Sequence, residues 1–222
     1  DPEDAIAVAD AVKVRPWPVG ELLLAGNHRI GSDGLKALTH KTFCQNVVSL
    51  DLSYTDAKDY RAVMVLEALA KLEPGNTMKQ IVLHGSLVVS DDVAAALQKL
   101  LTKNSSLRSI QMNDPGSPKP MTAPQLKTVL SGMQHNYEVE ELAIDYFKTT
   151  EDMRIWSEME FWLRLNVAGR RIVRHSEQRT SQWRTWLSIS LPDDWFQVLE
   201  KAGQDNLTVL YWIVRQGAHN FS

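Results

Sequence analysis

The 222-residue chain has a single cysteine, Cys44, no long apolar run and no excess of basic charge. One cysteine excludes an internal disulfide framework and a cysteine-rich zinc module. No apolar stretch reaches the roughly 18 residues that a membrane span needs. Lys and Arg number 24 against 27 Asp and Glu, a net charge of −3. Nucleic acid is therefore an unlikely partner, since proteins that hold phosphate backbones normally carry a basic excess.

The start of the chain bears on where the protein works. It begins at Asp1 rather than Met, and no signal-peptide pattern follows. We therefore expect a soluble, intracellular domain that is either processed or part of a longer protein.

Motifs for catalysis and for cofactor or metal binding are also missing. The glycine-containing segment 26–34 lacks the spacing of phosphate-binding loops, and neither GxSxG nor HExxH occurs. His40 and Cys44 are four residues apart and could share a helix face as base and nucleophile. A cysteine on such a helix more commonly packs as a small hydrophobe. The sequence thus predicts a protein that is not an enzyme and has no cofactor or metal.

What the chain does contain is an internal repeat. The pattern apolar-x-x-apolar-x-apolar recurs five times, with its middle members 28, 31, 29 and 32 residues apart. The copies are Val19-Leu22-Leu24, Val47-Leu50-Leu52, Met78-Ile81-Leu83, Leu107-Ile110-Met112 and Val139-Leu142-Ile144. The first four are each followed by a helical pattern, over 34–43, 61–72, 91–104 and 123–136. An asparagine ends each helical stretch (Asn46, Asn76, Asn104 and Asn136), and asparagine tolerates the left-handed conformation that closes a helix.

This pattern resembles a leucine-rich repeat of the ribonuclease-inhibitor type over residues 19–147. The resemblance implies an α/β solenoid of about five repeats, with parallel strands on a concave face and helices outside. That family's asparagine at the strand end appears only as Asn27. Thr55, Ser86, Pro115 and Phe147 stand at the equivalent places, and of these only the first two have small polar groups that can partly substitute.

The segments outside the repeats read as caps. Residues 1–18 predict an N-terminal cap, with a helix over 4–12 and Trp17 between two prolines placed to cover the first open edge. The alternative is that earlier repeats have been removed. Six of the seven tryptophans lie beyond residue 150. Helical patterns over 151–175, from about 191, and over 206–215 then predict a Trp-rich α-helical C-terminal cap or module over 151–222.

The C-terminal segment carries a second resemblance. FWLRLNVAGRR, then Trp195-x-x-Val198-Leu199 and LYWIVRQG, is similar to a module attached to leucine-rich repeats in diatom-type algal proteins. The chain keeps the leucine, asparagine, alanine, glycine and arginine of that pattern but has Val167 where the pattern usually has arginine. The resemblance implies an algal lineage and an architecture, and no reaction.

The concave face is the predicted binding surface. Its polar and apolar side chains can lose water on contact, and aromatic residues just past the strands are typical interface anchors. The predicted partner-binding residues are Asp51, Ser53, Tyr54, Gln80, Val82, His84, Gln111, Asn113, Glu141, Asp145 and Tyr146. We therefore expect a scaffold or complex subunit that binds a protein partner, in an oligomeric state that the sequence does not indicate.

Two other functions stay open. An arginine cluster over 164–184 could bind RNA or anionic lipid, and Arg170, Arg171 and Arg174 form a possible second contact. Acidic residues lie among these arginines, which favours a self-neutralising surface instead. Regulation of a small GTPase or of actin is a third reading, by analogy with other short leucine-rich repeat proteins.

Overall fold

The five apolar segments form one parallel sheet in the computed structural model, which describes residues 1–55, 59–85, 90–113, 120–146 and 149–167. The strands are β1 (Val19–Leu23), β2 (Val47–Asp51), β3 (Gln80–Val82), β4 (Ser109–Gln111) and β5 (Glu141–Ala143), side by side in chain order. The middle member of each apolar segment pairs with its counterpart next door, in the row Leu22, Leu50, Ile81, Ile110 and Leu142. The predicted parallel α/β arrangement is confirmed.

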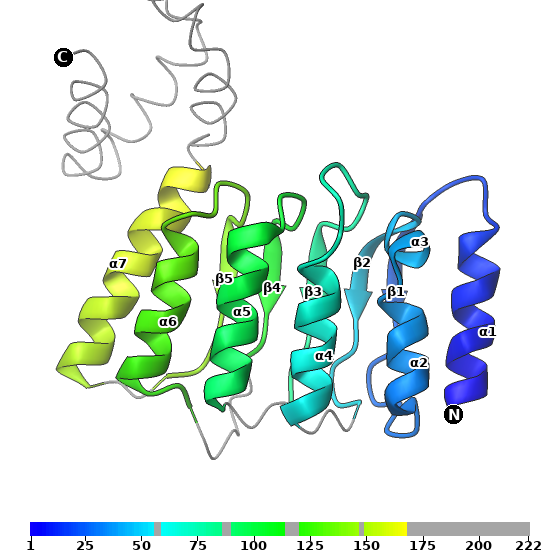
Figure 1. Ribbon diagram of the computed structural model, residues 1–222, viewed down its shortest axis with the longest axis horizontal. Helices are drawn as coiled ribbons and strands as arrows, with labels where there is room; N and C mark the ends of the chain where they lie inside the picture. Colours follow the sequence, from blue (N-terminus) through cyan, green and yellow to red (C-terminus); the bar gives the residue numbers. More distant parts are fainter. Residues whose placement is uncertain (56–58, 86–89, 114–119, 147–148, 168–222) are drawn as a thin grey trace, which may run out of the picture. The chain divides into compact units, whose positions relative to one another are not determined.

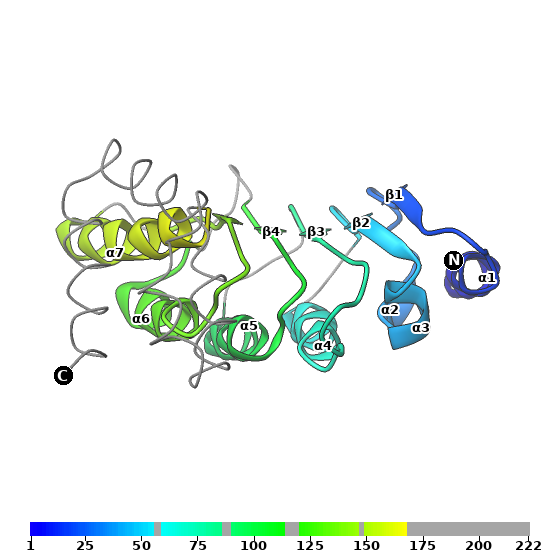
Figure 2. The same ribbon diagram turned by 90° about the horizontal axis from the view of Figure 1, so that it is seen from above.

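Seven helices accompany the sheet within the described residues. They are α1 (Pro2–Lys13), α2 (Gly31–Leu38), α3 (Lys41–Cys44), α4 (Asp59–Leu69), α5 (Asp91–Lys103), α6 (Ala123–Met133) and α7 (Thr150–Val167). Helices α2, α4, α5 and α6 form a layer on one side of the sheet (Figures 1 and 2). The core lies between the two layers, where Leu50, Leu66, Ile81 and Leu97 are fully buried.

The helix predicted over 34–43 is in fact two. The Thr39 hydroxyl donates to the carbonyl of Leu35 at 2.7 Å and closes α2. His40 is then extended, with φ −67° and ψ 142°, and its ring accepts the N–H of Thr42 at the start of α3. These local side-chain bonds compete with continuation of the helix.

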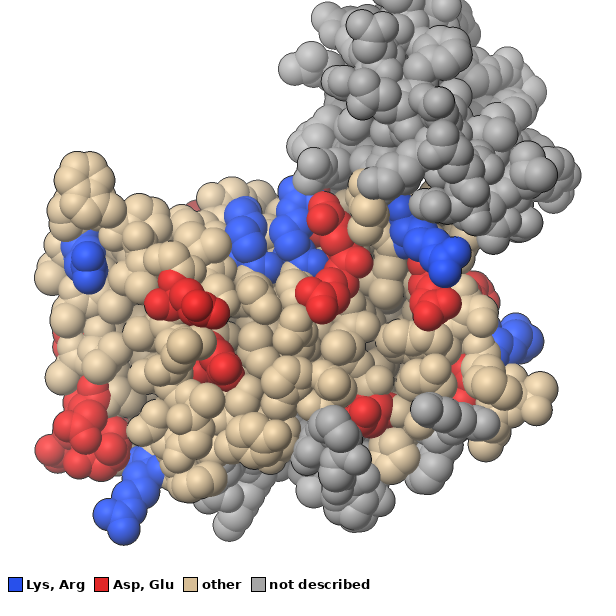
Figure 3. Space-filling view, turned by 180° about the vertical axis from the view of Figure 1, so that it is seen from behind, with Lys and Arg blue, Asp and Glu red and all other residues tan. Residues whose placement is uncertain are grey.

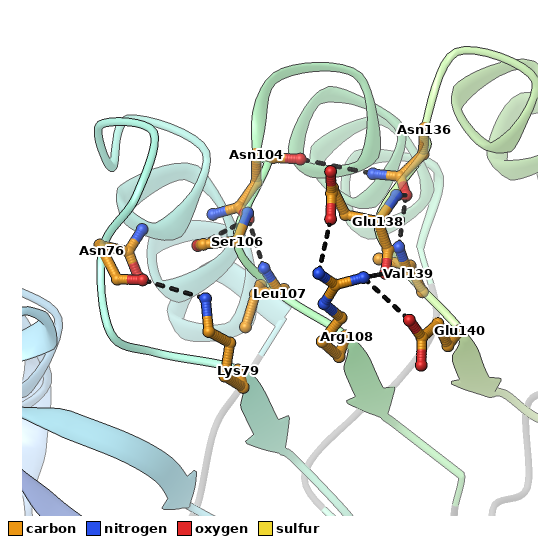
Figure 4. A network of polar contacts seen from close by, with 10 residues as sticks. All are labelled: Asn76, Lys79, Asn104, Ser106, Leu107, Arg108, Asn136, Glu138, Val139 and Glu140. Atoms are coloured by element: carbon orange, nitrogen blue, oxygen red, sulfur yellow. Dashed lines mark hydrogen bonds and ion pairs between the residues drawn. The ribbon is translucent and has the colours of Figure 1, made fainter. Parts of the chain in front are cut away.

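The recurrent asparagines do not adopt the predicted left-handed conformation. Asn104 has φ −81° and ψ 131°, and Tyr54 is the only described non-glycine residue with positive φ. The side chain of Asn104 works instead: its Oδ1 accepts the N–H groups of Ser106 and Leu107, and its Nδ2 donates to the carbonyl of Leu69 in the preceding repeat. Figure 4 shows the bonds accepted by Oδ1 of Asn104 and again those accepted by Oδ1 of Asn136. The Nδ2 of Asn136 likewise donates to a carbonyl of the preceding repeat, that of Leu101. Each of these two asparagines joins its repeat to the one before it.

A second polar position closes the strand ends. The Nδ2 of Asn27 donates to the carbonyl of Leu24 at 2.8 Å. The hydroxyl of Thr55 donates to the carbonyl of Leu52 at 2.7 Å, so a small polar group does substitute there. Ser86, Pro115 and Phe147 lie outside the described residues.

The N-terminal helix packs on the helix layer rather than on the sheet edge. A Cβ at Gly34 would lie 2.9 Å from Cβ of Ala5, so only glycine allows α1 to approach α2 this closely. Trp17 is 70% exposed. The expectation that Trp17 covers the first open edge is therefore wrong. The buried face of α1 packs against other helices instead.

The chain divides into two compact units, Asp1–Met159 and Glu160–Ser222. In the first unit, Ile155 and Met159 of α7 are buried as the helical spacing predicted. The helices expected from about 191 and over 206–215 lie outside the described residues. Among the described helices, none is long and apolar enough to cross a bilayer.

Candidate functional site on the strand face

We call the side of the sheet away from the helices the strand face. Alternate strand residues point to opposite sides, so the neighbours of the inward-pointing middle row face outward. The register places them in two rows, Glu21, Ser49, Gln80, Ser109 and Glu141, and Leu23, Asp51, Val82, Gln111 and Ala143. On this face, acidic and basic side chains are mixed and uncharged surface predominates (Figure 3).

Hydrogen bonds hold several of these side chains in place. The Ser109 hydroxyl donates to Oε2 of Glu141 at 2.7 Å, and Nε2 of Gln111 donates to Oε1 of Glu141 at 3.0 Å. The Ser49 hydroxyl donates to Oε1 of Gln80 at 3.3 Å. Side chains already ordered lose less rotamer freedom when a partner binds.

Two predicted contact residues offer little surface. Ser53 is 3% exposed, and its hydroxyl accepts the N–H of His84 at 3.2 Å. Its own N–H donates to Oδ1 of Asp51 at 2.8 Å. Val82 is also buried, on the central strand β3. Ser53 and Val82 therefore act in the framework of the face rather than as exposed contacts.

An aromatic rim lies past the C-terminal ends of β2 and β3. Tyr54 is 49% exposed and has φ 54°. Its ring lies against Gly85, where any Cβ would overlap it, and Gly85 itself has φ 64°. The ring Nδ1 of His84 lies 2.7 Å from the carbonyl oxygen of Asn113. The structure thus brings together Tyr54, His84 and Asn113, as the repeat spacing indicated.

The last strand ends in an aromatic stack. Tyr146 lies on Trp156 of α7 with ring centroids 4.9 Å apart and an angle of 18°. The backbone N–H of Met121 donates to the carbonyl of Asp145 beside it. Tyr146 is half-buried, so this end offers less aromatic surface than Tyr54. Sequence reasoning did not foresee the stack, because nothing in the α7 pattern pairs Trp156 with a strand end.

Sequence reasoning also missed a charge cluster at the N-terminal ends of the strands. Arg108 pairs with Glu138 at 3.0 Å and with Glu140 at 2.8 Å (Figure 4). Burial lowers the pKa of Lys79, the neighbouring Arg108 lowers it further, and Glu138 opposes both. A signal was present: Lys79, Arg108 and Glu140 each directly precede the first residue of a strand.

The structure argues against His40 and Cys44 acting as a catalytic base and nucleophile. Cys44 is fully buried, and burial raises the pKa of its thiol to about 12. The Nδ1 of His40 instead contacts the hydroxyl of Thr42 at 2.8 Å. Because a thiol nucleophile must ionise and be reached, Cys44 is a packing residue. Within the described ranges, no group of three or more potential ligands could hold a metal ion.

The predicted second contact, Arg170, Arg171 and Arg174, lies outside the described residues. Of the segment 164–184, only residues 164–167 at the end of α7 are described, and Arg164 is exposed. Contact through these arginines stays a prediction.

Solved structures of other proteins share this fold. The tropomodulin C-terminal domain of Caenorhabditis elegans matches with a TM-score of 0.58 and 16% identity, over 78% of this chain and 98% of that one. The structure of leiomodin-1 actin-binding site 2 matches with a TM-score of 0.55 and 14% identity, over 82% of this chain and 98% of that one. No family model and no curated protein matches the chain.

These neighbours correct the resemblance drawn from sequence. The chain was expected to be a ribonuclease-inhibitor-type repeat protein with a diatom-type algal module, and that assignment is wrong. The similar structures reported above are the leucine-rich-repeat-like domains of tropomodulin and leiomodin, and they give no support to an algal module. The short strand pattern is common to such repeats, so it identified the architecture without distinguishing the lineage. Of the module's motif residues, Leu165 and Asn166 lie buried in α7, and Ala168 and those after it lie outside the described residues.

Proposed function

We propose that this chain is a non-catalytic protein-interaction domain that binds a protein partner through the strand face and the Tyr54 rim. One observation carries the proposal: a row of hydrogen-bonded polar side chains lies beside two large, exposed anchors. Leu23 is 63% exposed on the strand face, and the Tyr54 ring is half exposed past the end of β2. Exposed apolar groups rimmed by ordered polar groups are typical of recognition surfaces.

The physical mechanism is preorganisation. The sheet fixes the backbone of each contact residue, and the bonds to Glu141 and Gln80 fix several side chains. A partner that buries Leu23 and Tyr54 gains apolar contact while ordering few new torsions. The polar rows then discriminate among partners, because a poorly matched partner leaves their donors and acceptors unpaired.

Actin is the first partner to test. The leiomodin-1 structure with the same fold is an actin-binding site, which supports the choice. A sequence identity of 14% indicates a shared fold but does not transfer individual contact residues. The variants for the test are therefore chosen from the surface of this chain.

The experiment measures actin binding by co-sedimentation with the full chain and two variants. The double variant Leu23→Asp/Tyr54→Ala is expected to bind about tenfold more weakly, since it removes both anchors. Val14→Asp is the matched control, because Val14 is also an exposed apolar residue but ends α1 instead of lying in the sheet. It is expected to bind within about twofold of the original chain.

A photo-crosslinker tests the face whichever protein binds. Placed at Gln111 it should capture the partner, and placed at Lys103 in the last turn of α5 it should not. Capture from Lys103 alone would refute binding through the strand face. Absence of actin binding would refute the choice of actin and leave the crosslinking test to judge the face.

The RNA or lipid alternative is distinguished by salt. A complex held by arginine contacts to phosphates weakens steeply as salt rises, whereas a strand-face complex weakens little.

A further inference from the structure

A second surface lies on the helix layer, opposite the strand face. A groove of about 540 Å³ runs between α2–α3 and α4. The groove is open to solvent along its length, so it suits an extended partner surface rather than an enclosed small molecule. The groove follows from the broken first helix: α2 has 8 residues, about 12 Å, beside the 11 residues, about 16 Å, of α4. The shorter helix leaves part of the α4 surface uncovered.

The floor of the groove is apolar. Val63, Met64 and Ala68 of α4 line it and are only half-buried, and Leu72 lies buried just beyond the end of α4. Half-exposed apolar side chains inside a groove gain from contact with another apolar surface.

The sides of the groove are basic. Lys36 and Lys41 line it from α2 and α3, His40 lies between those helices, and Lys71 lines it just past α4. This arrangement runs against the chain's net charge of −3. Lys36 also pairs with Asp33, at an exposed position where such a pair contributes little.

The one acidic residue among those lining the groove is already engaged. Glu67 accepts a hydrogen bond from Nζ of Lys99 on α5 at 2.7 Å, and this bond holds the carboxyl pKa below its usual value. At the mouth, Tyr60 is largely exposed, with the guanidinium of Arg61 over its ring at 5.6 Å. The groove therefore presents positive charge on both sides of an apolar floor.

We propose that this groove binds an acidic amphipathic helix of a partner protein. The apolar face of that helix would lie on Val63, Met64 and Ala68, with its flanking carboxylates toward Lys41 and Lys71. Helix-in-groove recognition uses this combination of an apolar stripe and charged flanks. A basic helix would meet like charges from the lysines that line the groove.

The test uses the full chain and a fluorescein-labelled 18-residue helical peptide with leucines on one face and glutamates beside them. Fluorescence anisotropy should show saturable binding that weakens as salt rises. The same peptide with lysine in place of each glutamate should not bind. The variant Lys41→Glu/Lys71→Glu should bind the acidic peptide about tenfold more weakly. Lys103→Glu on α5 removes a lysine away from the groove and should change binding less than about twofold.

Several results would overturn the proposal. These are no saturation up to about 1 mM acidic peptide, equal binding of the lysine peptide, or equal losses for Lys103→Glu and the groove variant. A second variant, Met64→Glu, acts through the floor and should also weaken binding, and circular dichroism establishes that each variant is folded. If phosphatidylserine vesicles bind and lose binding in the groove variant while the peptide does not bind, the groove serves lipid and the proposal fails. Leu23→Asp/Tyr54→Ala should leave peptide binding unchanged, so this proposal and the strand-face proposal can fail separately.

Discussion

Replacing Asn104 with alanine should be among the most damaging single changes in the segments that connect helices to strands. The side chain is 5% exposed and accepts the N–H groups of Ser106 and Leu107, each at 2.9 Å. It also donates to the carbonyl of Leu69 at 2.9 Å. Alanine leaves all three backbone groups without this partner, in a place that water reaches poorly.

The magnitude follows from the cost of buried unpaired groups. Each such group costs about 1–3 kcal/mol, and partial entry of water offsets some of the total. We expect Asn104→Ala to lower the free energy of unfolding by about 3 kcal/mol. For a chain of this size that corresponds to a fall in Tm of roughly 6–12 °C.

Urea denaturation followed by circular dichroism measures the effect. Asn27→Ala is the matched control: Asn27 also donates to a main-chain carbonyl but is exposed, so we expect a loss below about 1 kcal/mol. Asn136→Ala should repeat the large loss, because Asn136 makes the same three kinds of bond. Equal, small losses for Asn104→Ala and Asn27→Ala would show that the asparagines do not join the repeats.

Four further outcomes are expected. With a pKa of about 12, roughly one Cys44 thiol in 10⁴ is ionised at pH 8. Iodoacetamide should therefore modify Cys44 only after the chain unfolds. Rapid modification of the folded chain would contradict the burial of Cys44. Because the unfolded thiol ionises near pH 9 while the folded one stays protonated, the unfolding free energy should fall as pH rises from 9 to 12, and Cys44→Ala should reduce that slope. Arg108→Ala leaves the carboxylate of Glu138, which is 9% exposed, without its ion-pair partner. This should lower the free energy of unfolding by about 2 kcal/mol in urea denaturation, and by less in a Glu138→Gln background. An equal loss in both backgrounds would argue against the ion pair. Gly85→Ala should destabilise the chain by about 1–3 kcal/mol through its positive φ and the overlap with Tyr54, and less in a Tyr54→Ala background, as a double-mutant cycle would measure.

The strand register could be predicted from sequence because one physical requirement repeats. Leu22, Leu50, Ile81, Ile110 and Leu142 must share one interior, and their spacing alone aligns them. The break between α2 and α3 could not be predicted, since it depends on bonds made by Thr39 and His40 that an apolar pattern does not contain.

The candidate site was predictable only in outline. Outward positions follow from strand alternation, so Gln80, Gln111 and Glu141 were placed correctly on the strand face. Burial of Ser53 and Val82 depends on how closely neighbouring strands and loops approach, which alternation does not indicate. The groove between α2–α3 and α4 arises from unequal helix lengths, a property of two elements together rather than of either segment.

The asparagine joints also limit how far a disturbance travels. Asn104 bonds to Leu69, and Asn136 to Leu101, so each joint connects a repeat only to its immediate predecessor. In a linear array with nearest-neighbour coupling, stabilising one end hardly changes the stability of the far end. When a peptide binds the groove between α2–α3 and α4, amide hydrogen exchange should therefore slow around β1 and β2, while β5 keeps its original exchange rates.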